Sequence, residues 1–598
     1  MIAAPYEGLT IVAGDGEPDV LPIHALGVSD VELTRTPSSD LMAFALASLS
    51  DPTKEGGYAV RHGMAPLNEF GETVEAQGGR NPLAAAFPVL FPYGVGGIEA
   101  PRTVKVSLNE HAKWALQYHN RRFATHHSFP FVVFAIIQKR EAMRSARLQM
   151  RRKDFERDAI ALASITLADL KKAEVQEGRR EPITNSKVRM LRNHVVAANG
   201  RVQGSDNAWA QYRGMIWGTC LFLGGPSLWI TINPANIHDP VVQVLAGEAI
   251  DLDQFNNLLG PDASRRAEVI ASNPYAAAEY FDFIIRAVLE ELFGIKKTKG
   301  HVTSTTGILG GISSYFGVVE AQGWGTLHLH MLMWLIGTPD CDEMAQKLQS
   351  EEFREKIRQY IRANIRAHRD DLNEEAIKTV SKEPQLAYSR PLNPDQDNWE
   401  EANRDLERRL VRTQQVHACS RATCLRIQNG ILSCKRRAPW PLSDDDFVDT
   451  GGNWGPKRTN GYINNYCPLL LTSMRCNHDI KLNTNGADTK DVAFYVTAYA
   501  TKKQKKSHNL SALMANSLSY HLENPKFDDI RERNRLLIYR CINVINREAE
   551  LSSPQVASYI MGYGDNVTSH QYAPMYTTQF YGVVKHMFPD LRTHLGNG

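Results

Sequence analysis

Two histidines stand two residues apart in an apolar stretch of the chain, His328 and His330. A glycine-containing turn separates this stretch from an alternating segment that carries Glu320 and Gln322, so the sequence predicts two strands joined by a tight turn. Side chains alternate along a strand, which places both imidazoles on one face and Glu320 and Gln322 together on the neighbouring strand. Such ligands can hold one divalent cation and leave positions open for phosphate oxygens. The alternative is a polar, solvent-facing side of an amphipathic strand.

A second pattern that could do chemistry lies further along the chain. If the segment around it is a helix, Tyr495 and Tyr499 are i and i+4 and share a face, and Lys502 lies one turn further on. A tyrosine can form a covalent link to phosphorus, but its pKa near 10 requires a phosphate polarised by a metal or a cation. The alternative is an amphipathic helix that packs two tyrosines into a core.

Taken together, the HxH and YxxxYxxK patterns resemble the two-tyrosine HUH endonucleases. The surrounding segments resemble the Rep nuclease region of Helitron rolling-circle transposases of the kind found in fungal genomes. The resembling segments occur in order from about residue 80 to residue 570, and many ordered matches are more specific than any one motif. They are Phe87–Gly94, Leu228–Pro234, Val319–Gln322 with Leu327–His330, Cys434–Pro439, Asn464–Tyr466, Arg475–Ile480 and the tyrosine segment.

The resemblance implies an activity and a fold. It implies a single-stranded DNA endonuclease and strand transferase acting on transposon ends. His328, His330 and Glu320 or Gln322 would bind Mg²⁺ or Mn²⁺, and Tyr499 or Tyr495 would form a 5′-phosphotyrosine. The expected fold class is α+β: an antiparallel HUH/Rep sheet covered by helices, with mostly helical N- and C-terminal regions. Two alternatives stay open: a catalytically inactive relic or domesticated DNA-binding protein, and a zinc-stabilised scaffold whose HxH pair is incidental.

A group of thiols and one imidazole suggests a separate structural zinc site. His417, Cys419 and Cys424 form an HxCx4C pattern, and Cys434 follows ten residues later. These ligand types suit tetrahedral zinc. The spacing is looser than a paired CxxC motif, so free thiols remain an alternative. Cys467, Cys476 and His478 are further candidate ligands.

Aromatic and basic side chains precede these motifs. Trp114, Tyr118 and Phe123 stand where a helix is expected, and they could stack on nucleic-acid bases, although aromatics at helical spacing are more often core. The helical stretch from Phe134 to Glu177 is rich in lysine and arginine. This stretch could follow a phosphate backbone or could simply be a solvated face.

The composition bounds the remaining possibilities. A chain of 598 residues is long enough for several domains. A net charge of +2 requires any nucleic-acid surface to be local. Eight cysteines without a recognisable signal peptide favour a reducing compartment, and no apolar run is long enough to span a membrane. With the resemblance, these features indicate a nuclear protein.

The motifs divide the chain into consecutive segments. They are a loosely structured leader (1–75), a Helitron-like N-terminal region with basic helices (76–205), a Rep core with the metal-binding strands (206–340), a charged helical insertion (341–415), a zinc segment (416–480), a tyrosine helix (481–510) and a helical C-terminal region (511–598).

Two departures from the resembling family stand out. No GxxxxGK[ST] phosphate-binding loop is present in the sequence, so a separate helicase is expected to unwind the DNA. Trp324 stands where the resemblance leads one to expect an arginine.

Overall fold

The computed structural model describes most of the chain from Asn81 onward. The described ranges are 26–27, 58–59, 81–93, 96–100, 103–151, 155–255, 260–298, 301–322, 325–373, 375–383, 386–421, 424–428, 430–484, 509–523, 528–573, 583–584 and 586–588. The chain divides into two compact units, Met1–Phe123 and Ala124–Gly598.

The first unit contains two short helices among its described residues, α2 (Pro82–Ala86) and α3 (Leu108–Leu116). Strands β1 (Leu26–Gly27) and β2 (Tyr58–Ala59) pair in parallel. Helix α3 begins with a capping box, in which the Ser107 hydroxyl accepts from the Glu110 backbone N–H and the Glu110 carboxylate accepts from the Ser107 backbone N–H.

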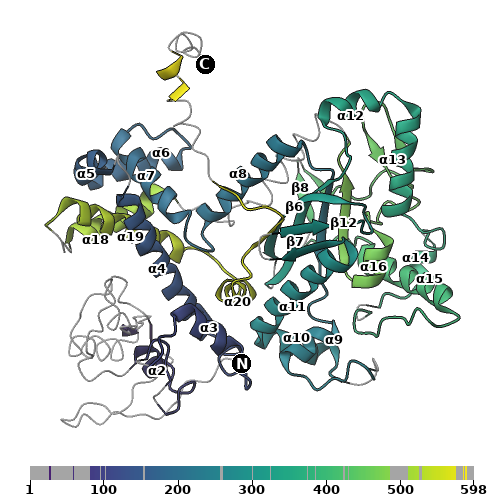
Figure 1. Ribbon diagram of the computed structural model, residues 1–598, viewed down its shortest axis with the longest axis horizontal. Helices are drawn as coiled ribbons and strands as arrows, with labels where there is room; N and C mark the ends of the chain where they lie inside the picture. The colour runs from purple at the N-terminus through teal and green to yellow at the C-terminus, as the bar shows by residue number, and fades with distance from the viewer. Residues whose placement is uncertain are drawn as a thin grey trace. The chain divides into compact units, whose positions relative to one another are not determined.

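A five-stranded antiparallel sheet is the centre of the second unit (Figure 1). Its spatial order is β12 (Asn477–Leu482), β3 (Leu228–Asn233), β7 (Thr326–Leu335), β6 (Ile312–Gln322) and β13 (Asn566–Thr568). Strands β6 and β7 form the hairpin that the sequence predicts. The outer strands come from segments far away in the chain, which makes the sheet a long-range structure.

One face of the sheet is apolar and carries the main core. Directly paired residues lie on the same face, and the row Ile480, Ile230, Met331 is completely buried. Helices α11 (Pro274–Ala287), α12 (Cys341–Lys347), α13 (Glu351–Asn364) and α16 (Pro468–Met474) contribute to this core. Strand β3 alternates between buried and half-buried residues, as a strand between a core and a more polar face should.

Helix α8 (Asp206–Leu223) packs on part of the opposite face. Its Tyr212 and Ile216 contact Phe316, Val318, Leu332 and Trp334 of β6 and β7. The candidate metal ligands lie on this same face, so α8 covers only part of it.

A helical bundle forms the other large part of the second unit (Figure 1). Two stretches far apart in sequence share its core. The first comprises α4 (Phe129–Met150), α5 (Phe155–Ala163), α6 (Leu167–Gly178) and α7 (Ser186–Asn199), and the second α18 (Leu510–Glu523) and α19 (Ile530–Arg547). Helix α20 (Ser553–Met561) follows and packs on α4 through stacked Phe134 and Tyr559 rings, whose centroids are 5.2 Å apart.

The remaining elements are short or peripheral. The helices are α9 (Pro240–Ala246), α10 (Ala263–Ser272), η2 (Val288–Leu292), α14 (Ala376–Thr379), α15 (Trp399–Leu410) and η3 (Val411–Gln415). The strands form the hairpins β4 (Ile295–Thr298) with β5 (His301–Ser304), β8 (Leu425–Gln428) with β9 (Ile431–Cys434), and β10 (Phe447–Val448) with β11 (Trp454–Gly455).

The expected α+β class and antiparallel sheet are confirmed in this coarse form. The sequence interpretation did not assign β12 and β13 to the sheet, although they form its two edges. Within the described ranges, no helix has both the length and the apolar character needed to cross a membrane.

Candidate metal centre

The β6–β7 register brings three predicted ligands onto one face. Glu320 pairs directly with His328, and His330 pairs with Val318. Because Val318 and Glu320 are two residues apart, all of these side chains point to the same side. Their ligand atoms lie within 4.8 Å of one another. The structure thus brings Glu320, His328 and His330 together.

Both imidazoles approach a single carboxylate oxygen. The Nε2 atom of His330 lies 3.2 Å from Glu320 Oε2, and His328 Nε2 lies 3.5 Å from the same atom. The two rings are nearly perpendicular, at 82°. The side chains of His328 and His330 are only 3% and 7% exposed, whereas that of Glu320 is 29% exposed. The carboxylate is therefore the group of the three that a phosphate or water could reach most easily.

The protonation states suit cation binding. Burial would raise the pKa of the Glu320 carboxyl, but the nearby His328 and His330 imidazoles outweigh burial and lower it to about 2. Burial, partly opposed by Glu320, lowers the pKa of His330. An ionised carboxylate beside a neutral imidazole is the form that binds a divalent metal.

A buried nitrogen of His328 that lacks a hydrogen-bond partner among the described residues supports a metal ion between the three side chains. His328 Nε2 is buried and makes no hydrogen bond to any described residue. Buried polar atoms without partners are rare in folded proteins. A cation bound by His328, His330 and Glu320 would satisfy this nitrogen.

The hydroxyl of Thr231, on the neighbouring strand β3, forms a hydrogen bond with the ring nitrogen of His330 that faces away from Glu320. Thr231 of β3 pairs with His330, and its Oγ1 lies 2.9 Å from His330 Nδ1. With Nδ1 engaged in this bond, Nε2 faces Glu320. Asp479 of β12 pairs with Thr231 on the other side, and its Oδ1 is buried without a hydrogen-bond partner among the described residues. The sequence does not single out Thr231, although strand alternation alone places it on the face opposite Ile230.

The turn between β6 and β7, which carry the candidate ligands, favours a glycine at its end. Gly325 has a φ of +92°, a conformation that favours glycine. A Cβ at this position would also lie 3.2 Å from the Cβ of Ser552, which caps α20.

Several other predicted residues cannot be placed. Tyr495, Tyr499, Lys502 and Trp324 lie outside the described residues, as does the side chain of Gln322. Their roles remain predictions from the sequence.

A second group with metal-binding character forms beside the β8–β9 hairpin. The ligand atoms of His417, Cys419, Cys424 and Cys434 lie within 4.8 Å of one another. His417 Nε2 is 3.3 Å from Cys434 Sγ. Cys424 and Cys434 belong to the two arms of one hairpin, since the Lys435 backbone N–H donates to the Cys424 carbonyl over 2.8 Å. Three thiols and one imidazole at these distances fit a tetrahedral zinc ion.

The other candidate zinc ligands, Cys467, Cys476 and His478, are buried in the core or engaged in a hydrogen bond. Cys467 and Cys476 are buried in the main core, where burial raises the pKa of both thiols, that of Cys476 to about 12. His478 Nε2 accepts the Cys467 backbone N–H over 2.8 Å. Among the described residues, only the two groups above bring three or more metal-binding side chains together.

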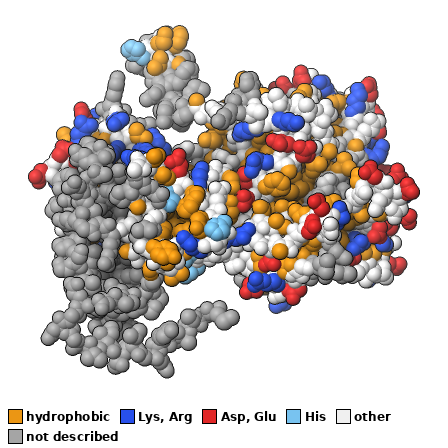
Figure 2. Space-filling view, turned by 60° about the horizontal axis from the view of Figure 1, so that its bottom comes forward, with side chains coloured by type: hydrophobic (Ala, Val, Ile, Leu, Met, Phe, Trp, Pro, Cys, Tyr) orange, Lys and Arg blue, Asp and Glu red, His pale blue; other side chains and the backbone are white. Residues whose placement is uncertain are grey.

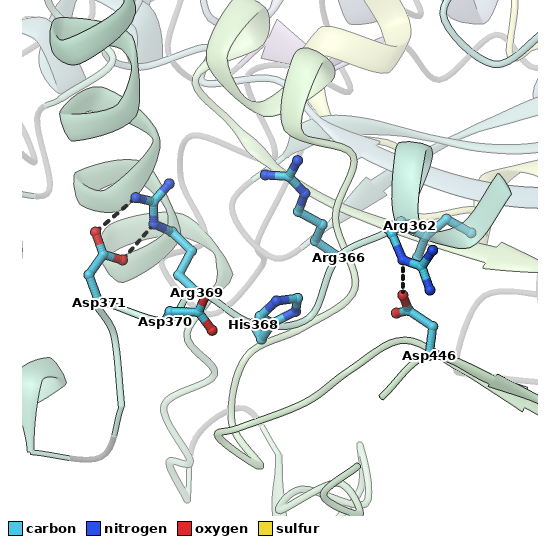
Figure 3. A pocket seen from close by; sticks show the side chains of 8 residues that line it. Arg362, Arg366, His368, Arg369, Asp370, Asp371 and Asp446 are labelled. Atoms are coloured by element: carbon cyan, nitrogen blue, oxygen red, sulfur yellow. Dashed lines mark hydrogen bonds and ion pairs between the residues drawn. The ribbon is translucent and has the colours of Figure 1, made fainter. Parts of the chain in front are cut away.

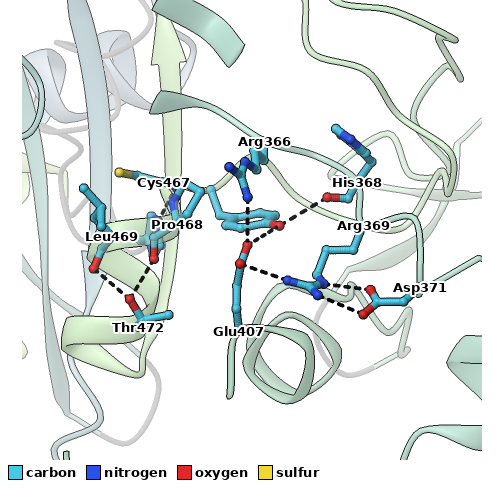
Figure 4. Close-up of polar contacts among 11 residues, drawn as sticks. Arg366, His368, Arg369, Asp371, Glu407, Cys467, Pro468, Leu469 and Thr472 are labelled. Atoms are coloured by element: carbon cyan, nitrogen blue, oxygen red, sulfur yellow. Dashed lines mark hydrogen bonds and ion pairs between the residues drawn. The ribbon is translucent and has the colours of Figure 1, made fainter. Parts of the chain in front are cut away.

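A depression of about 490 Å³ follows the C-terminus of α13 (Figure 3). It is lined by arginines and aspartates that pair with each other, including Arg362 with Asp446 at 3.3 Å and Arg369 with Asp371 at 2.8 Å. Beside it, Glu407 accepts from Arg366, Arg369 and the Tyr466 hydroxyl (Figure 4). These charges therefore neutralise one another in pairs.

Comparison with known proteins places the first metal group in a defined domain. Residues 111–333 match the family model described as the Helitron helicase-like domain at the N-terminus. The matched range includes Thr231, Glu320, His328 and His330. No curated protein matches the chain.

Proposed function

Because this chain is a Helitron-type protein, we propose that it is a metal-dependent endonuclease and strand transferase for single-stranded DNA. The single observation that carries the proposal is the convergence of Glu320, His328 and His330 on one face of the sheet, within the Helitron-type domain. A divalent cation, Mg²⁺ or Mn²⁺, held there would polarise the scissile phosphate. Gln322, two residues from Glu320 on the same strand, is a further candidate ligand.

The nucleophile is a tyrosine of the downstream segment. In the proposed reaction, the phenolic oxygen of Tyr499 attacks phosphorus, the bond from phosphorus to the 3′ oxygen breaks, and that oxygen takes up a proton as the phenol loses one. The products are a 5′-phosphotyrosyl protein and a free 3′ hydroxyl. Lys502 stabilises charge at the phosphate, and Tyr495 serves the reverse joining step on a second strand. A water nucleophile is not needed, so the phosphoester bond is conserved for strand transfer.

The histidine–cysteine group has a different role. We propose that His417, Cys419, Cys424 and Cys434 bind a structural zinc ion that fixes the β8–β9 hairpin. A site with four protein ligands leaves no position for substrate.

The surface charge agrees with a local nucleic-acid site. On the face in Figure 2, basic and acidic side chains are mixed rather than gathered into one large field, in keeping with the net charge of +2. A net charge this small means that any DNA-binding surface must be local.

Trapping the covalent intermediate tests the proposal. Purified protein is incubated with a labelled pool of random single-stranded oligonucleotides, with Mn²⁺ or with EDTA, and protein–DNA adducts are isolated under denaturing conditions and mapped by mass spectrometry. We expect an adduct on Tyr499 or Tyr495 that requires Mn²⁺ and disappears in His328→Ala and His330→Ala. The exposed His127→Ala variant is the matched control. DNA binding without any tyrosine adduct would contradict the proposal and identify the chain as a DNA-binding relic.

A further inference from the structure

The end of helix α3 exposes an aromatic side chain in an unusual setting. Trp114 is 52% exposed, although tryptophan is highly buried on average. Phe123, which follows the same helix, is 1% exposed and belongs to the local core. The structure therefore separates the aromatics that the sequence left undecided: Phe123 is core, and Trp114 is surface.

These aromatics form a connected ladder. The ring centroids of Trp114 and Tyr118 are 5.0 Å apart, and those of Tyr118 and Phe123 are 5.8 Å apart. Tyr118 follows Gln117, the C-cap of α3, and its ring contacts that of Trp114 as the chain leaves the helix. The buried Phe123 anchors the ladder, and the exposed Trp114 is its outer end.

A cation is held against the ladder without an acidic partner. The Arg122 guanidinium carbon lies 4.7 Å from the Tyr118 ring centroid and 5.0 Å from that of Phe123. Its Nε is buried, and among the described residues it has no hydrogen-bond partner. A guanidinium that stacks on aromatic faces keeps its outer N–H groups free to bind a phosphate.

The charge around the ladder is positive. Between Ser107 and Phe123 the basic residues are Lys113, Arg121 and Arg122, and Glu110 is the one acid. The Glu110 carboxylate is already occupied at the start of α3, where the Ser107 hydroxyl donates to it over 2.9 Å and lowers its pKa. The one acidic side chain of this segment is thus engaged at the start of α3.

We propose that Trp114, Tyr118 and Arg122 form a platform for single-stranded DNA, on which Trp114 stacks against a base and Arg122 binds the adjacent phosphate. This inference rests on the proposed function for the identity of the strand. Exposed aromatic faces beside a cation are a recognition mode of single-stranded nucleic acids, whose bases are free to stack. The bases of a duplex are stacked on each other, so a duplex would gain only the phosphate contact.

Binding in the absence of metal tests the platform. The full chain is titrated against a fluorescein-labelled oligothymidylate in EDTA, and affinity is measured by fluorescence polarisation at several salt concentrations. We expect Trp114→Ala to weaken binding on the order of tenfold, with Trp114→Phe close to wild type. Arg122→Gln should weaken binding and reduce the slope of log affinity against log salt by about 0.7, which Arg122→Lys should restore.

The matched control uses a similar aromatic–arginine pair elsewhere. Tyr520 is 47% exposed, and Arg540 lies 4.9 Å from its ring centroid. Tyr520→Ala should leave DNA affinity unchanged, and an equal loss in this variant would overturn the proposal. As a measurement that needs no variant, photo-crosslinking of an oligonucleotide containing 5-iododeoxyuridine should label the peptide with Trp114 to Arg122. Labelling only elsewhere, or equal affinity of a duplex or of an RNA strand, would also overturn it.

The binding test of the platform and the adduct test of the endonuclease can fail independently of each other. If the wild type forms the tyrosine adduct and Trp114→Ala binds DNA as tightly as the wild type, the platform alone is wrong. If DNA binding depends on Trp114 but no tyrosine adduct forms with Mn²⁺, the platform stands and the endonuclease proposal falls.

Discussion

The hydroxyl of Thr231 determines which nitrogen of His330 faces the candidate cation. Its Oγ1 is 2.9 Å from Nδ1, and Nε2 is 3.2 Å from Glu320 Oε2. Partners of this kind orient a ligand histidine and fix its tautomer, and their loss typically weakens metal binding about 10- to 100-fold. We therefore expect Thr231→Val to reduce Mn²⁺ affinity by about this factor, measured by calorimetric titration without DNA.

The control for this prediction keeps the hydroxyl. Thr231→Ser should retain affinity within a few-fold of the wild type, because serine can make the same bond to Nδ1. Equal Mn²⁺ affinity of the wild type and Thr231→Val would show that the hydroxyl does not position His330.

The two tyrosines are expected to differ in function. Lys502 is three residues after Tyr499 and seven after Tyr495, so on a helix its ammonium is nearer Tyr499 and can stabilise the phenolate or the attacked phosphate. Tyr499→Phe should abolish first-strand cleavage, whereas Tyr495→Phe should leave cleavage detectable and impair strand transfer. Gel analysis of labelled oligonucleotides separates the two steps. An adduct mapped only to Tyr495 would reverse the assignment.

At the scale of elements, we expect the β8–β9 hairpin to depend on the zinc ion proposed at His417, Cys419, Cys424 and Cys434. Both arms are largely exposed, and Ile427 and Ile431 are 77% and 70% exposed, so little apolar burial stabilises the hairpin. Structural zinc sites supply folding free energy in such segments. The double variant Cys419→Ser with Cys424→Ser should lose zinc in elemental analysis and become sensitive to proteolysis at this hairpin.

Cys220→Ser is the control, since Cys220 lies on α8 outside the cluster. The Cys220→Ser variant should retain its bound zinc after mild chelation. A wild-type protein that is metal-free as isolated and fully stable would rule out the zinc site.

His478 joins three elements and makes their packing pH-dependent. Its ring in β12 lies beside Gln415 of η3 and accepts the backbone N–H of Cys467, just before α16. Complete burial lowers the pKa of His478 to about 4. The unfolded chain takes up this proton near pH 6.5, so between pH 6.5 and 4 it binds more protons than the folded chain, and acid favours unfolding.

The stability from His478 should be fully present above pH 6.5 and fall as the pH decreases toward 4. The loss is at most about 1.4 kcal/mol per pH unit. Urea unfolding at several pH values measures it, and His478→Gln should reduce the slope in this window. An unchanged slope would mean that His478 is not buried in its neutral form.

At the scale of the whole second unit, Asp565 connects distant segments. Its carboxylate accepts from the Tyr212 hydroxyl of α8 and, over 2.7 Å, from the Tyr559 hydroxyl of α20. Its backbone carbonyl accepts from Val319, next to Glu320 in β6. The edge strand β13 follows directly, so one residue ties two helices to β6, the strand that carries Glu320.

Removing this carboxylate should destabilise the unit. Asp565→Ala leaves two buried phenols without an acceptor, and we expect a loss of roughly 2–5 kcal/mol in chemical denaturation. Metal affinity should fall as well, because β6 loses its edge support. The control is Asp528→Ala, an exposed aspartate before α19. A loss in Asp565→Ala no greater than in this control would contradict the role.

The sequence by itself determined the local features of this protein. Alternation around Glu320, His328 and His330 predicts a hairpin with both imidazoles on one face, because strand side chains have a fixed period of two. The ligand types of His417, Cys419, Cys424 and Cys434 indicate a metal group for a similar reason, since chemical identity and close spacing are local properties. Both candidate metal-binding groups could therefore be predicted from the sequence without knowledge of the tertiary structure.

Tertiary structure alone decided what surrounds these groups. Thr231 and Asp479 reach the metal face only because β3 and β12 pair beside β7, and pairing between distant strands leaves no mark in local spacing. The sequence also left Trp114 and Phe123 equivalent, since exposure depends on what packs against each ring. Cys467, Cys476 and His478 were plausible zinc ligands by type, and burial in a core built from distant segments gave them a structural role instead.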